Sequence, residues 1–108
     1  MKKSTSKKKK ALDKSFVDFI VEQIQGAGNI SHKYMFGGCA IYRGSKVVAL
    51  VCGDRLYVRP TEGGRKFIEK VDEKPPYPGA KAHFLIEDNI DDKEWLSELI
   101  RITGEELS

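Results

Sequence analysis

Residues 33–60 read KYMFGGCAIYRGSKVVALVCGDRLYVRP and decide the fold of this chain. Apolar and polar side chains alternate along the stretch, and the dipeptides Gly44-Ser45 and Gly53-Asp54 interrupt the alternation. Glycine followed by a polar residue is typical of a two-residue β-hairpin turn, because glycine accepts a positive φ at the first turn position. The stretch therefore predicts three antiparallel strands over residues 32–59.

The two turns imply a strand register, because a two-residue turn pairs the residues that flank it. The predicted pairs are Arg43 with Lys46, Ile41 with Val48, Cys39 with Leu50, Cys52 with Arg55, Leu50 with Tyr57, and Val48 with Arg59. Side chains alternate between the two faces of a sheet. An almost wholly apolar face follows, and we expect it to be buried; it carries Gly38, Ala40, Tyr42, Val47, Ala49, Val51, Leu56 and Val58.

The opposite face of this predicted sheet carries basic side chains around an apolar patch. Apolar patches with a polar rim are typical of contact surfaces, so we predict that this face binds a partner. The predicted partner-binding residues are Arg43, Lys46, Val48, Leu50, Arg55, Tyr57 and Arg59.

Helical periodicity appears before and after the strands. Residues 13–25 place Phe16, Val17, Ile20, Val21 and Ile24 on one apolar stripe, which predicts a helix. Helices are also predicted over 61–72 and 89–103, and a strand over 82–87 with a shorter one near residue 77. The predicted fold is α+β with the order α-β(3)-α-β(2)-α, a two-layer domain whose antiparallel sheet has its helices packed on one face.

Charge divides the chain into two parts. Its 108 residues carry a net charge of +3, with 19 Lys and Arg against 16 Asp and Glu. Residues 1–10 hold six lysines and no acid, so the remainder holds 13 basic residues (19 − 6) and a net charge of −3. We predict a disordered Lys-rich arm over residues 1–12 and a single domain over 13–108. No apolar run is long enough to span a bilayer, and a cytoplasmic protein is expected.

The residues that could carry chemistry are few. Cys39 and Cys52 lack a CxxC spacing, and His32 and His83 are the only histidines. No phosphate-binding, dinucleotide or metal-binding motif is present, so no cofactor and no metal are predicted. We predict no enzymatic activity, although a Cys–His pair brought together by the fold stays open as an alternative.

The motif Met35-Phe36-Gly37-Gly38, followed by the strand rhythm "AIYRGSKVVALVCGDRLYVR", resembles the N-terminal domain of the TfoX (Sxy) family of competence regulators. The resemblance covers roughly residues 14–103 and implies the same α-β(3)-α-β(2)-α fold. Full-length members regulate DNA-uptake genes and carry a second, C-terminal domain. The resemblance implies no catalytic residues. Within the motif, we expect Gly37-Gly38 to bend a strand start, with Met35 and Phe36 as apolar bulk on opposite faces.

Two classes of partner follow from these observations. The first hypothesis is a regulatory module that binds another protein or a second copy of itself through the basic-rimmed face. The alternative is a nucleic-acid binder that uses the Lys-rich arm and the basic residues of that face, Arg43, Lys46, Arg55 and Arg59. The net acidity of the domain and a thin supply of exposed aromatic rings argue against the alternative.

Overall fold

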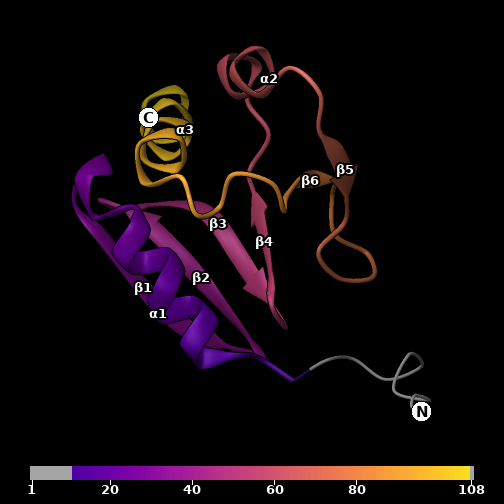
Figure 1. The fold of residues 1–108 in the computed structure, drawn as a ribbon. Coiled ribbons are helices and arrows are strands. Elements are labelled where there is room, and N and C mark those ends of the chain that lie inside the picture. Colours follow the sequence, from indigo (N-terminus) through magenta and orange to yellow (C-terminus); the bar gives the residue numbers. More distant parts are fainter. Residues whose placement is uncertain (1–10, 108) are drawn as a thin grey trace.

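Within residues 11–107, three α-helices lie against a six-stranded antiparallel sheet (Figure 1). The computed structural model describes residues 11–107, so residues 1–10 of the predicted Lys-rich arm lie outside the described residues. The elements are α1 (Lys14–Gln23), the 3₁₀-helix η2 (Gln25–Ala27), β1 (Ile30–Met35), β2 (Gly38–Arg43), β3 (Lys46–Cys52), β4 (Arg55–Val58), α2 (Glu62–Ile68), β5 (Asp72–Lys74), β6 (His83–Ile86) and α3 (Lys93–Glu106).

The sheet has the strand order β1-β2-β3-β4-β6-β5, with β1 and β5 at its edges. Every neighbouring pair is antiparallel. The predicted α+β class is therefore confirmed. The predicted strand count is wrong, because four strands precede α2 where three were expected.

The additional strand arises because the MFGG motif forms a turn. Met35 pairs with Gly38, and the two residues between them have positive φ angles, 50° at Phe36 and 77° at Gly37. This is the pattern of a type I′ turn, which usually holds Asn-Gly. Phenylalanine is not a typical turn residue, so local sequence does not indicate a hairpin at this position. The expected role of Met35 and Phe36 as apolar bulk is also wrong: Met35 is 37% exposed and Phe36 104% exposed.

The other two turns form as predicted, with a φ of 63° at both Gly44 and Gly53. The register of β2 with β3 nevertheless shifts between Ile41 and Tyr42. Ile41 pairs with Ala49 and not with Val48, and Cys39 pairs with Val51 and not with Leu50. Val48 is thus the extra residue of a β-bulge. The remaining predicted pairs, such as Leu50 with Tyr57, are confirmed.

The bulge changes which residues face the helices. In β4 and the second half of β3 the apolar face is the predicted one, but in β2 the two faces are exchanged. The residues buried between sheet and helices are Cys39, Ile41, Val48, Ala49, Val51, Leu56 and Val58, together with Phe84 and Ile86 of β6. Gly38, Ala40, Tyr42 and Val47, expected in the buried face, lie on the opposite one.

The helices complete the core with their apolar stripes. Asp13 caps α1 by accepting from the Phe16 N–H at 3.1 Å, and Val17 and Ile20 of that helix are fully buried. Thr61 caps α2 and Asp92 caps α3. Helix α3 therefore begins four residues after the predicted start at position 89 and ends at Glu106. Caps of this kind satisfy N–H groups that have no partner inside the helix.

Replacing Phe36 with asparagine should stabilise the fold. A non-glycine residue with left-handed φ costs about 1 kcal/mol, and asparagine tolerates this conformation better than phenylalanine. Because the Phe36 ring is fully exposed, its removal costs no core packing. We expect F36N to raise the free energy of unfolding by about 0.5 kcal/mol or more in urea denaturation. A lower value would show that the ring makes a stabilising contact.

Candidate functional site

The sheet face opposite the helices has an apolar centre, and we call it the open face. A row of paired residues crosses it from β3 to β6, with Leu50 opposite Tyr57 and Tyr57 opposite Leu85. Tyr57 is 7% exposed and Leu85 5% exposed, although neither belongs to the core between sheet and helices. This centre is therefore largely shielded from solvent, whereas Leu50 is half-buried.

Basic side chains surround this apolar centre. Arg55 of β4 and Arg59, which directly follows that strand, alternate with Tyr57 along the chain, and both are exposed. By register, Lys33 of β1 and Lys74 of β5 share the open face. An acidic side chain, that of Asp72 in β5 opposite Leu85, also lies on the open face. The open face is consequently apolar at its centre and basic at its rim.

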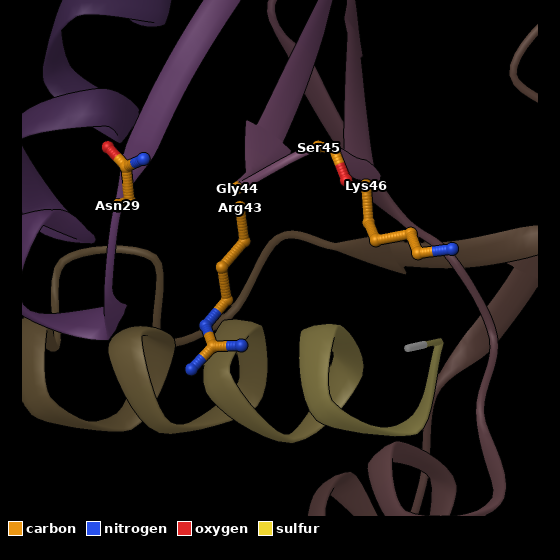
Figure 2. A pocket seen from close by; sticks show the side chains of 5 residues that line it. All are labelled: Asn29, Arg43, Gly44, Ser45 and Lys46. Carbon is orange, nitrogen blue, oxygen red and sulfur yellow. The ribbon is translucent and has the colours of Figure 1, made fainter.

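Three of the predicted partner-binding residues do not lie on this face. Val48 is fully buried against the helices because of the bulge. Arg43 and Lys46 lie at the β2–β3 turn, where they line a surface pocket with Asn29, Gly44 and Ser45 (Figure 2). The premise that all seven residues share one face is therefore wrong. Leu50, Arg55, Tyr57 and Arg59 do share the open face, and their role in binding stays a prediction.

Arg43 holds three elements together. Its side chain points toward α3, whereas Lys46 extends away from that helix (Figure 2). The Arg43 Nε donates to the carbonyl oxygen of Ala27 in η2 at 2.7 Å, and Nη2 lies 3.9 Å from the Glu105 carboxylate. A Cβ atom on Gly104 would lie 2.5 Å from the Arg43 Cδ, so α3 approaches this side chain closely. Arg43 therefore has a structural role.

A second exposed surface was not predicted from the sequence. Edge strand β1 and its turn carry three aromatic side chains at alternate positions, His32, Tyr34 and Phe36, which we call the aromatic edge. The His32 and Tyr34 rings meet edge-to-face at 5.4 Å, and the Lys14 Nζ lies 5.3 Å from the Tyr34 ring centroid. All three side chains are exposed. The alternation is visible in the sequence, but a half-buried strand has the same period.

The Tyr34 hydroxyl stays protonated at neutral pH. Partial removal from water, and secondarily the nearby Asp18 carboxylate, raise the pKa of this group above its ordinary value. The ring is therefore neutral and retains both its hydroxyl donor and its aromatic face.

The cysteines lie on opposite faces of the sheet. Cys39 is 2% exposed on the helix side, and burial raises the pKa of its thiol. Cys52 lies on the open face opposite Arg55, whereas His83 lies at the other end of β4. The register therefore separates Cys52 from His83, and burial disfavours the Cys39 thiolate. Within residues 11–107, no three His, Cys, Asp or Glu side chains gather in a metal-binding arrangement.

None of the helices between residues 11 and 107 is long and apolar enough to cross a membrane. The architecture defines a small α+β domain whose helices cover one face of an antiparallel sheet. The chain matches the TfoX N-terminal domain over residues 22–106, and it belongs to that family. The family that the MFGG motif and the following strands indicated is therefore confirmed.

A curated relative is similar along nearly its whole length. It is an uncharacterised 12.7 kDa protein encoded in the trpE 5′ region of Spirochaeta aurantia. The two sequences are 34% identical over 97 residues, which cover 90% of this chain and 84% of the relative.

Replacing Arg43 with alanine should destabilise the domain. The substitution removes a charged donor from the Ala27 carbonyl and empties the space beside Gly104. We expect a loss of about 1 to 3 kcal/mol in urea denaturation. Exposed Lys46 on the same turn provides the matched control, and K46A should change stability by less than about 0.5 kcal/mol. Equal effects of the two substitutions would contradict the structural role of Arg43.

The Cys39 thiol should react slowly in the folded protein. In a C52S variant, Cys39 is the remaining thiol, and each unit by which its pKa is raised leaves tenfold less thiolate. We expect alkylation by iodoacetamide at pH 8 to be roughly tenfold or more slower than after unfolding in guanidinium. A native rate equal to the unfolded rate would indicate an accessible thiol and would revive the Cys–His alternative.

Proposed function

We propose that this chain is a non-enzymatic regulatory module that binds an acidic protein through the open face. The observation that carries the proposal is the helix-free side of the sheet, which is apolar at its centre and basic at its rim. The regulatory part, including a role in competence within the cytoplasm, rests on membership in the TfoX N-terminal domain family.

The composition of the open face suits protein recognition. Tyrosine and arginine are enriched among residues that dominate binding energy, and Tyr57 of β4 lies between Arg55 and Arg59 in the chain. Leu50, half-buried beside Tyr57, offers apolar area that a partner would remove from water. The rim charges would orient an acidic partner during approach.

Charge also decides between an acidic partner and a second copy. Two open faces related by a twofold axis would bring basic rims together, because such an interface is self-complementary. Like charges facing each other across an interface cost free energy. Acidic residues of the chain are concentrated instead over residues 87–106, in and before α3 on the helix side. We therefore favour another protein over a homodimer through this face.

Site-specific crosslinking tests the proposal. A photoreactive phenylalanine analogue is placed at Leu50 on the open face or at exposed Lys66 on α2, and cells of the source organism are irradiated. We expect a discrete protein adduct from position 50 and none from position 66. Reversing both rim charges (R55E with R59E) should reduce the adduct at least tenfold, because the rim attracts an acidic partner. Tyr57 is unsuitable for this test, since its burial would confound binding with stability.

Two results would contradict the proposal. The first is labelling at position 50 that does not exceed labelling at position 66. The second is a position-50 adduct that persists unchanged after charge reversal, since the rim would then have no part in recognition.

A further inference from the structure

Two positive charges lie directly opposite each other at the β2–β3 turn. The register pairs Arg43 with Lys46, so their Cβ atoms leave the sheet on the same side. Like charges at opposed positions of an antiparallel pair destabilise it. The pair therefore has an electrostatic cost, which an anion bound next to both cations would relieve.

Arg43 is held in one place with its charge only partly balanced. Its Nε donates to the carbonyl oxygen of Ala27, a neutral partner, at 2.7 Å. A Cβ atom on Gly28 would lie 2.9 Å from this nitrogen, so the guanidinium has little freedom to move. The nearer Glu105 oxygen lies 3.9 Å from Nη2, beyond hydrogen-bond distance, and the other Glu105 oxygen accepts from Arg101 at 2.9 Å. The guanidinium therefore stays available to a further anionic partner.

Lys46 is the accessible member of the pair. It is exposed, and its ammonium forms no ion pair with any carboxylate of residues 11–107. The two side chains diverge from the turn, which leaves the space beside it open (Figure 2). Lysine has a flexible four-carbon stem, so the ammonium can approach an anion held by Arg43.

Both side chains line a surface pocket that offers donors and no acid. The pocket has a volume of about 530 Å³, within the range of sites that hold small molecules. Its other lining residues are Asn29, Gly44 and Ser45, so none of the five is acidic. The Asn29 amide and the Ser45 hydroxyl add uncharged hydrogen-bond donors to the two cations. This composition favours an anion with several acceptor oxygens.

We propose that this pocket binds the phosphate group of a small, soluble phosphomonoester. Such a group carries a charge of about −1.5 to −2 at neutral pH and three acceptor oxygens. Arg43 supplies a fixed guanidinium, Lys46 supplies a mobile ammonium, and the two charges together balance the dianion. A phosphodiester carries about one negative charge and balances only one of the two cations. The pocket lies at the β2–β3 turn and depends neither on the open face nor on the proposed protein partner.

An NMR titration of the ¹⁵N-labelled full chain with inorganic phosphate, methyl phosphate and dimethyl phosphate tests the proposal at constant ionic strength. We expect saturable shifts of the Gly44 and Ser45 amide signals, with a Kd of about 1 to 10 mM for the first two ligands and much weaker binding of the diester. K46A should raise the Kd roughly tenfold, whereas K46R should retain binding. Exposed Lys66 on α2 supplies the matched control, and K66A should leave the Kd unchanged.

Three outcomes would overturn the proposal. They are absence of a saturable shift at Gly44 and Ser45, a Kd of K46A equal to that of the unsubstituted chain, and equal affinity for dimethyl and methyl phosphate. Cosedimentation with phosphatidate vesicles, without any response to the soluble ligands, would assign the pocket to a membrane surface instead. Crosslinking from position 50 should be unaffected by K46A, so failure of either proposal can be recognised without the other.

Discussion

Burial of two consecutive apolar residues, Val48 and Ala49, is the constraint on which the sheet depends. Both side chains are fully buried against the helices, although neighbours in a regular strand point to opposite faces. The bulge opposite Ile41 resolves this conflict by placing both on the core side. Complete burial of a valine side chain contributes about 1.5 to 3 kcal/mol, which favours the bulge over the regular register.

The bulge also determines which basic residues contact the helices and which stay exposed. Because β2 is displaced relative to the regular register, Ile41 and Arg43 face the helices together. Arg43 then reaches the Ala27 carbonyl and the C-terminal part of α3, where it links three elements. Arg55 lies beyond the displaced region, and Arg59 pairs with the bulge residue Val48, yet both arginines stay exposed. One extra residue thus separates structural from accessible arginines.

The two exposed surfaces have different physical origins. The open face exists because the three described helices all pack on one side of the sheet, leaving the row of Leu50, Tyr57 and Leu85 without helical cover. The aromatic edge exists because β1 ends the sheet and turns tightly at Phe36. A well-packed core tolerates the unfavourable φ at this turn, since a cost of about 1 kcal/mol is small against total stability.

The sequence by itself determined the α+β class, the helical stripes, the turns at Gly44 and Gly53, and the family. These features depend on interactions between residues a few positions apart, so local patterns report them. Only the tertiary structure decided the bulge at Val48, the role of Arg43 and the turn at Phe36. Each results from packing between distant segments, which selects a register or a strained turn that local preference does not favour.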